Sequence, residues 1–485
     1  MKEKIDIEHQ VNGRIMRKKD MIANTKMIMA ATLLIGMMTT ACDNRQKEEK
    51  GQQQEQISLI TLDPGHFHAA LVQKSMYPGV DSVVHVYAPT DGKDLQAHLG
   101  LVERYNGDAD HPTHWKEEVY TGDDFLQKML QDRKGNVVVL AGNNKRKIDY
   151  ISQSINAGLN VLADKPMAIN EEGFKTLEKS FADAKEKNVM LYDIMTERFE
   201  ITATLQKEFS QIESLFGSLE KGSLEEPAIT KESVHHFFKT VSGKPLIRPT
   251  WFFDVSQQGE GIVDVTTHLV DLVQWEGFPN QAIDYKKDIE LLAAKRWPTW
   301  LKAAEFQKAT NETYPDTFQA NVNDKNELGV YANGEINYTI KGVHAKVVVK
   351  WNFEAPEGTG DTHYSIMRGS KANLIIKQGE DEHYKPVLYL EAVGKDKAGF
   401  EKAVEEAVAE VAKKYDGVTA EKLKNGYYKI VVPEVLATSH EEHFAQVTNN
   451  YLRYLKEGKL PDWEVPNMIA KYYVTTKALA LATKK

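Results

Sequence analysis

The chain has 485 residues, of which 41% are hydrophobic and 27% charged, the composition of a globular protein large enough for two domains. Its formal net charge of -9 supplies no basic field that could hold nucleic acid, so we expect a small-molecule ligand. The one cysteine, Cys42, excludes a disulfide or a thiolate metal cluster within one copy.

The N-terminal segment has the pattern of an export signal. Lys26 precedes an apolar stretch over residues 27–41, which is short for a membrane span and suits the core of a secretory signal. Because Cys42 follows directly, the segment resembles the signal of a bacterial lipoprotein, which implies a lipid on Cys42 and a location in the cell envelope. Residues 1–41 are then a signal peptide and residues 42–56 a polar tether. The alternative is a chance apolar segment with a buried free thiol.

Between residues 57 and 200, strand-like and helix-like segments alternate. Apolar runs predict strands over 57–62, 82–88, 136–142, 160–166 and 188–195. Helical patterns lie between them, over 68–76, 123–132, 147–158 and 171–187. Such alternation is typical of a doubly wound parallel sheet, so we expect a domain of that kind over residues 57–200.

The rest of the chain has a different character. Residues 327–356 alternate apolar and polar side chains and contain Asn333-Gly334, a pair typical of a tight turn between antiparallel strands. We therefore expect residues 201–485 to form a second, α+β domain, which would bind the substrate and take part in any oligomer.

Two short motifs give the chain a family resemblance. Asp164-Lys165-Pro166 ends a predicted strand, and Asp264 stands four residues before His268 in a predicted helix. With these motifs, the chain from about residue 57 to its end resembles the Gfo/Idh/MocA family of NAD(P)-dependent sugar oxidoreductases. The resemblance implies a Rossmann-like N-terminal sheet, a large and mostly antiparallel C-terminal sheet, and a nicotinamide cofactor, NAD or NADP.

The loop after the first strand departs from the family pattern. "DPGHFH", residues 63–68, keeps only the middle glycine of Gly-x-Gly-x-x-Gly, Gly65, because Asp63 and His68 replace the outer two. A helix starting near Phe67 would still offer free N–H groups to a phosphate. The residues expected to contact the cofactor are Gly65, His66, Phe67, Asp91, Asn144, Asp164 and Lys165. Asp91, the candidate for the ribose, has an equally good interpretation as a solvated loop carboxylate.

Three side chains are the candidates for catalysis. Oxidation of a sugar hydroxyl needs a base for the hydroxyl proton and a cation that polarises the forming carbonyl. His268 suits the base, Lys165 the cation, and Asp264 either a substrate contact or a group that tunes the imidazole. Simpler interpretations exist as well: Lys165 could be a solvated lysine at the end of a strand, and His268 a packed or capping residue.

The remaining site residues are less constrained by the sequence. The substrate candidates are Arg198, Trp251 and Phe253, although the two aromatic residues could equally be buried in a structured loop. Lys147 is expected at the surface. His66 and His68 lack a carboxylate or a third histidine at ligand spacing, so no metal is expected.

Three functions remain open from the sequence: a carbohydrate dehydrogenase, a glycosidase that uses NAD transiently, and a catalytically silent sugar-binding lipoprotein. An envelope compartment is not expected to supply free dinucleotide, so the cofactor is predicted to be tightly bound. The expected partners are a carbohydrate and, through the lipid alone, a membrane, and a homo-oligomer stays open.

Overall fold

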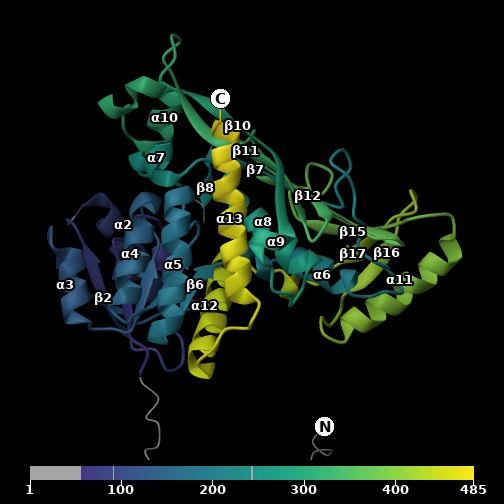
Figure 1. Cartoon of the computed structure of the whole chain (residues 1–485), viewed down its shortest axis with the longest axis horizontal. Helices are drawn as coiled ribbons and strands as arrows, with labels where there is room; N and C mark the ends of the chain where they lie inside the picture. The colour runs from purple at the N-terminus through teal and green to yellow at the C-terminus, as the bar shows by residue number, and fades with distance from the viewer. Residues whose placement is uncertain (1–55, 91, 242–243, 485) are drawn as a thin grey trace, which may run out of the picture. The chain divides into compact units, whose positions relative to one another are not determined.

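The computed structural model describes residues 56–90, 92–241 and 244–484. The predicted signal peptide, Cys42 and Asp91 lie outside the described residues. From residue 55 onward the chain forms one compact unit. This unit contains both of the sheets that the sequence predicts (Figure 1).

The first sheet is parallel and has six strands in the order β3-β2-β1-β4-β5-β6. The strands are β1 (Leu59–Leu62), β2 (Val83–Ala88), β3 (Lys116–Thr121), β4 (Val137–Leu140), β5 (Asn160–Asp164) and β6 (Leu191–Ile194). The helices that connect them are α1 (His68–Leu71), α2 (Lys93–Asn106), α3 (Phe125–Asp132), α4 (Asn144–Asn156) and α5 (Glu171–Lys187). This is the strand order of a dinucleotide-binding fold, so the predicted doubly wound sheet is confirmed.

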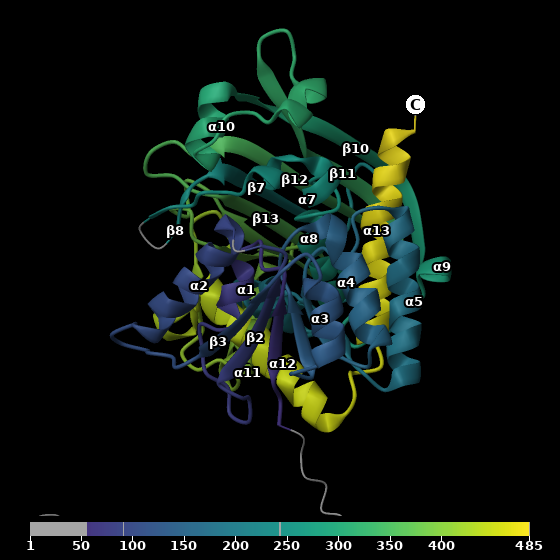
Figure 2. The same ribbon diagram turned by 90° about the vertical axis from the view of Figure 1, so that its left-hand side faces the viewer.

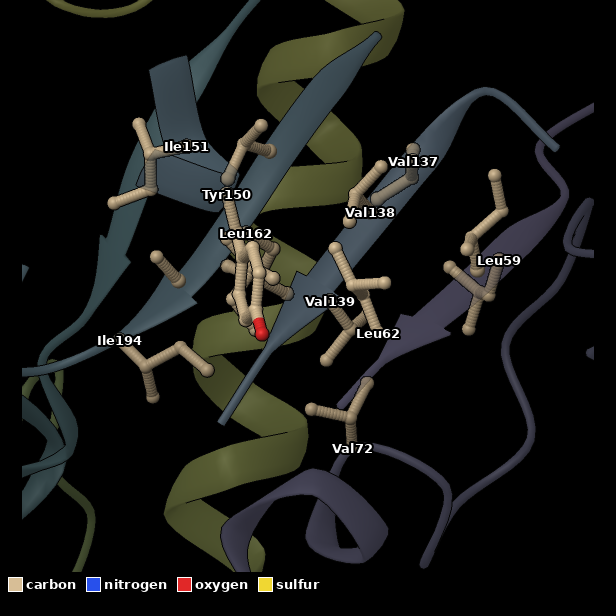
Figure 3. Close-up of a cluster of buried hydrophobic side chains, with 14 of the residues drawn as sticks. Leu59, Leu62, Val72, Val137, Val138, Val139, Tyr150, Ile151, Leu162 and Ile194 are labelled. Carbon is tan, nitrogen blue, oxygen red and sulfur yellow. The ribbon is translucent and has the colours of Figure 1, made fainter. Parts of the chain in front are cut away.

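The core of this sheet follows from its sequence pattern. Strands β1, β4 and β6 are buried along their whole length, and they are largely apolar, with Thr61 in β1 and Asp193 in β6 as the polar exceptions. Figure 3 shows their side chains gathered together with Tyr150 and Ile151, which belong to α4. Asn170 caps α5 by accepting a hydrogen bond from the N–H of Gly173.

The second sheet has nine strands in the order β10-β11-β12-β7-β13-β14-β15-β17-β16. All neighbouring strands are antiparallel except β12 and β7, which confirms a large and mostly antiparallel sheet. The strands are β7 (Ile229–Phe238), β10 (Ile289–Lys302), β11 (Glu327–Ile340), β12 (Val343–Glu354), β13 (Thr362–Arg368), β14 (Ala372–Gln378), β15 (Val387–Ala392), β16 (Thr419–Lys422) and β17 (Tyr428–Val431). A separate small pair joins β8 (Thr240–Val241) and β9 (Lys244–Pro245).

The predicted turn at Asn333-Gly334 is wrong. Both residues lie inside β11, and the hairpin to β12 turns at Lys341-Gly342, where both residues have positive φ, at 50° and 77°. Gly334 has a packing role instead, because a Cβ atom there would lie 2.6 Å from the side chain of Ile262. The glycine lets the segment before α8 approach the strand.

The remaining helices connect and cover the sheets. They are α6 (Ile201–Ser210), α7 (Val255–Gln258), α8 (Thr266–Gly277), α9 (Tyr285–Asp288), α10 (Ala303–Thr310), α11 (Lys397–Ala412), α12 (His440–Glu457) and α13 (Glu464–Thr483). Short 3-10 turns cover Thr196–Phe199, Thr250–Phe253, Asp316–Asn321 and Glu434–Leu436. None of the helices in the described residues combines the length and the apolar character needed to cross a bilayer.

The two C-terminal helices return to the first sheet. Phe444 and Tyr451 of α12 and Tyr472 of α13 are buried in the core of the dinucleotide-type sheet. Figure 1 shows α13 beside α5 and running on to β10, so one helix packs against both halves. The predicted domain 201–485 therefore contributes its last two helices to the core of the first sheet.

Candidate active site

A cavity of about 550 Å³ lies between the carboxyl ends of the parallel strands and the second sheet. We call it the inner cavity. Its walls come from the loop after β1, the end of β5, the start of α8 and strand β7. Figure 2 shows β7 and β13 above α8, with the strands of the first sheet below. Open α/β sheets bind ligands at this end of their strands.

Lys165 and Asp264 meet in the inner cavity. The Lys165 Nζ donates to Asp264 Oδ1 at 2.7 Å, and their side chains are only 10% and 8% exposed. Gln258 donates from Nε2 to the other carboxylate oxygen at 2.9 Å. Asp264 precedes the first residue of α8 by two positions, so it lies in the turn before the helix and not, as predicted, in the same helix as His268. This turn points the carboxylate at Lys165.

His268 lies in the first turn of α8 and lines the same cavity. Burial lowers the pKa of this imidazole well below its usual value, and the charge of Lys165 lowers it further. Its Nδ1 is buried and has no hydrogen-bond partner in the described residues. A neutral imidazole with a free nitrogen can accept a proton from a substrate hydroxyl.

Asp164 is surrounded by imidazoles. His68 Nδ1 lies 3.0 Å and His66 Nδ1 3.6 Å from Asp164 Oδ2. Burial alone would raise the pKa of Asp164, but the neighbouring His68 and His66 hold it well below its usual value. His68 and His66 themselves have lowered pKa values, chiefly because they are buried.

Lys147 is not at the surface, which corrects the prediction. Its Nζ donates to Asn144 Oδ1 at 2.6 Å and to the main-chain oxygen of Asp164 at 2.8 Å. The side chain is fully enclosed, and burial lowers its pKa to about 8. Asn144 in turn donates to the main-chain oxygen of Gln258 at 2.8 Å, so this pair links α4 to both β5 and the end of α7.

A second cavity, of about 870 Å³, opens beside the first one. We call it the outer cleft. It is lined by the loops after β1, β2 and β4, and Gly65, His66 and Phe67 lie in its wall. A Cβ atom on Gly65 would lie 3.4 Å from Trp251 and 3.5 Å from Gly142, which are ordinary van der Waals distances, so the protein neighbours alone do not require a glycine here. Size and position fit a dinucleotide.

The departures of the loop from the glycine pattern have structural partners. Asp63 has a φ of 48° in place of the first glycine, and its carboxylate accepts a hydrogen bond from Tyr150 at 2.7 Å. His68, in place of the last glycine, pairs with Asp164. The predicted helix over 68–76 is wrong in length, since α1 has four residues and is too short to supply a helix dipole. The loop N–H groups of Gly65 and His66 both donate to the main-chain oxygen of Ala141, which leaves Arg146 as the cationic side chain of this region that lines the cleft.

The comparison with known families identifies the family of the second half of the chain. Residues 205–483 match the family model described as "Putative oxidoreductase C terminal domain". The chain belongs to this oxidoreductase family. No curated protein sequence matches this chain.

Solved structures agree with this oxidoreductase fold. A crystal structure described as a putative oxidoreductase from Parabacteroides merdae is 57% identical, with a TM-score of 0.86, and the match covers 88% of this chain and 97% of that one. Levoglucosan dehydrogenase in complex with NADH and levoglucosan is 11% identical, with a TM-score of 0.56 and coverage of 88% and 97%. KijD10, a 3-ketoreductase from Actinomadura kijaniata solved with NADP, is 12% identical, with a TM-score of 0.53 and the same coverage. The last two share the fold.

Two residues predicted to contact the substrate, Arg198 and Phe253, line neither the inner cavity nor the outer cleft. Arg198 is buried, donates from two nitrogens to Asp271 at 2.6 and 2.7 Å, and pairs with Glu464 at 2.8 Å. It lines neither cavity, so its role is to join α8 to α13. Phe253 is a core residue that packs against Phe306, and its neighbour Phe252 lines the cavities instead. Trp251 lines both cavities, and its substrate contact stays a prediction.

The structure adds residues that the sequence motifs did not indicate. Arg248 is buried between the two cavities, donates to the main-chain oxygens of His236 and Phe237, and has no ion-pair partner in the described residues. On the far wall, Asp361 accepts from His236 at 2.8 Å and pairs with Lys239 at 3.0 Å. No local spacing connects these residues, because three different segments supply them.

Proposed function

We propose that this protein transfers a hydride between the carbon of a carbohydrate hydroxyl, with C3 as the first candidate, and a tightly bound nicotinamide dinucleotide, NAD or NADP. The observation that carries the proposal is the convergence of Lys165, Asp264 and His268 in one buried cavity that adjoins the outer cleft. A lysine, a carboxylate and a neutral imidazole are the groups that alcohol oxidation needs.

The dinucleotide would lie along the outer cleft, held by Gly65, His66, Phe67 and Arg146, and would supply the hydride chemistry when bound, while Asn144 lies in the wall of the inner cavity. Within the inner cavity, Lys165 donates a hydrogen bond to the reacting oxygen and stabilises the negative charge that develops on it. Asp264 holds the Lys165 Nζ in position.

His268 removes the hydroxyl proton. The low pKa of its imidazole keeps it neutral near pH 7, so it can accept a proton without first having to lose one. The wall of the cavity is rich in polar groups, among them His235, Asp361 and Gln378, which suits a ligand with several hydroxyl groups.

The experiment compares the products formed from a chromogenic aryl glycoside. A keto-sugar that keeps its aglycone supports the dehydrogenase, a free aglycone supports the NAD-dependent glycosidase, and binding without turnover supports a silent sugar-binding protein. The variants His268→Ala and Lys165→Ala are each expected to lose about 100-fold or more in rate. His114→Ala and Lys179→Ala are the matched controls, since both side chains are exposed.

Tight retention of the cofactor is tested without any turnover. Protein that has never been given NAD is purified and denatured, and the supernatant is analysed by absorbance and mass. Near-stoichiometric dinucleotide supports the proposal, whereas an empty protein that works only with added, freely exchanging NAD contradicts it. The proposal also places the mature chain in the cell envelope, anchored through a lipid on Cys42.

A further inference from the structure

Two imidazoles and one carboxylate converge at the floor of the inner cavity. His66 and His68 come from the loop after β1, and Asp164 is the last residue of β5. The ligand atoms that these three residues offer all lie within 4.8 Å of one another. Both Nδ1 atoms face the same oxygen, Asp164 Oδ2, at 3.6 Å for His66 and 3.0 Å for His68.

These separations are the ones found between neighbouring ligands of a single metal ion. Two ligands that each lie about 2.1 Å from an ion are about 3.0 Å apart at an angle of 90° and about 3.6 Å apart at 120°. The two observed nitrogen-to-oxygen distances therefore correspond to ligand–ion–ligand angles of about 120° and 90°, the angles of a five-coordinate, trigonal bipyramidal site.

The histidines are held in place from the other side. The ring of His68 packs against Phe444 of α12 at 4.6 Å, and the rings of His66 and His68 lie 4.1 Å apart, edge to face. His66 Nδ1 is buried and has no hydrogen-bond partner in the described residues. A buried nitrogen without a partner is costly, and a ligand at this point would relieve that cost.

The two nearby lysines donate to groups other than the carboxylate of Asp164. Lys147 donates to the main-chain oxygen of Asp164, and Lys165 donates to Asp264. Among the described residues, neither lysine forms an ion pair with Asp164. The Asp164 carboxylate is therefore shared only by the two imidazoles and stays available to a cation.

We propose that His66, His68 and Asp164 bind one divalent transition-metal ion, with Zn²⁺ as the first candidate. Two imidazoles and one carboxylate suit Zn²⁺, Mn²⁺ or Fe²⁺ better than Mg²⁺ or Ca²⁺, which prefer oxygen ligands. Three protein ligands leave positions open, as in metal sites that bind substrate. Those positions face the inner cavity, because all three residues line it.

The location suggests which ligand would complete the coordination. His68 and Asp164 line the inner cavity alone, whereas His66 lines the outer cleft as well. The ion would thus lie on the substrate side of the site. If the proposed function holds, two adjacent oxygens of a sugar, a diol or an α-hydroxyketone, are the chemical class that would chelate it.

The test measures metal binding directly on the full chain without a histidine tag. Protein stripped with a chelator is titrated with Zn²⁺ against a chromogenic competitor, and bound metal is counted by mass spectrometry after dialysis. We expect one Zn²⁺ per chain, weak or no binding of Mg²⁺, and an anomalous signal between the three residues in zinc-soaked crystals. Loss of an outer-shell partner weakens metal sites by about 10–100-fold, so His68→Ala and Asp164→Asn should each weaken binding by at least about 100-fold.

The control variant is His114→Ala, which removes an exposed histidine and should leave the affinity unchanged. Circular dichroism checks that each variant is folded, and His66→Ala provides a second ligand variant should Asp164→Asn fail to fold. Binding that is absent, or equal in wild type and His68→Ala, overturns the metal site. Dinucleotide content is measured on the same samples: protein that holds NAD without metal contradicts only this inference, and protein that holds metal without NAD contradicts only the proposed function.

Discussion

Replacing Arg198 by methionine separates a structural role from a substrate-binding one. The guanidinium makes two hydrogen bonds to Asp271 and two to Glu464, at distances from 2.6 to 3.1 Å. Asp271 would keep Lys471 as a partner at 2.8 Å, but Glu464 would keep only Tyr192, at 3.4 Å. The variant therefore leaves a buried carboxylate with little compensation.

The size of the effect follows from that uncompensated charge. Removing one partner of a buried ion pair costs about 3–5 kcal/mol. The entropy of unfolding grows with chain length, and for a unit that spans residues 55–485 each kcal/mol lowers the melting temperature by roughly 1 °C, so Arg198→Met should melt about 3–6 °C below the wild type. The control is Arg453→Met, which removes an exposed pair with Glu457 and should cost about 0.5 kcal/mol or less.

The assay combines thermal unfolding, followed by circular dichroism, with steady-state kinetics below the melting temperature of the variant. We expect a large loss of stability and an unchanged KM for the sugar. An unchanged melting temperature together with a KM raised tenfold or more would show that Arg198 contacts the substrate after all and that the reasoning from its ion pairs is mistaken.

Three further predictions concern the pH dependence of activity, the pH dependence of stability and the cellular location. Because burial lowers the pKa of His268, the acid limb of kcat/KM should lie below pH 6.5, and a limb at or above that pH would argue against His268 as the base. Burial raises the pKa of Glu117 from 4.5 to about 7, so the folded protein binds this proton more tightly than the unfolded chain. The wild type therefore loses stability relative to Glu117→Gln as pH rises from 4.5 to 7. At pH 8 the glutamine variant should be more stable by about 2 kcal/mol after allowance for partial exposure, as checked by urea unfolding at pH 4 and 8. Cys42→Ser should release the protein from membranes, and unchanged fractionation with no acyl label on the wild type would refute the lipid anchor.

The sequence predicted the parts of the fold that depend on local periodicity. The wholly buried strands β1 and β4 read as short apolar runs, and α5 was predicted over the residues it occupies. Helix α2 and strand β3 were not predicted. For β3 the reason is its exposure: all of its residues are exposed or half-exposed, so it lacks an apolar run. Helix α1 was predicted over residues 68–76, but only His68–Leu71 adopt α-helical geometry.

The site was predictable only where one short motif carries the chemistry. Lys165 and His268 came from such motifs, and the structure brings both to one cavity. The partners of Arg198 are 73 and 266 residues away in the chain, and the carboxylate beside His68 is 96 residues away. Distances of this kind leave no local spacing to detect. A paired signal was present, however: two histidines just after one buried strand and an aspartate at the end of another.

The changed glycine loop is better explained as a substitution of contacts than as loss of a cofactor site. Asp63 adopts positive φ, which costs a non-glycine residue about 1 kcal/mol, and the hydrogen bond from Tyr150 offsets a cost of that size. His68 fills the space of the last glycine and joins the loop to Asp164. Both replacements tie the loop to neighbouring segments, α4 and β5. The loop is thus held in one conformation at both replaced positions.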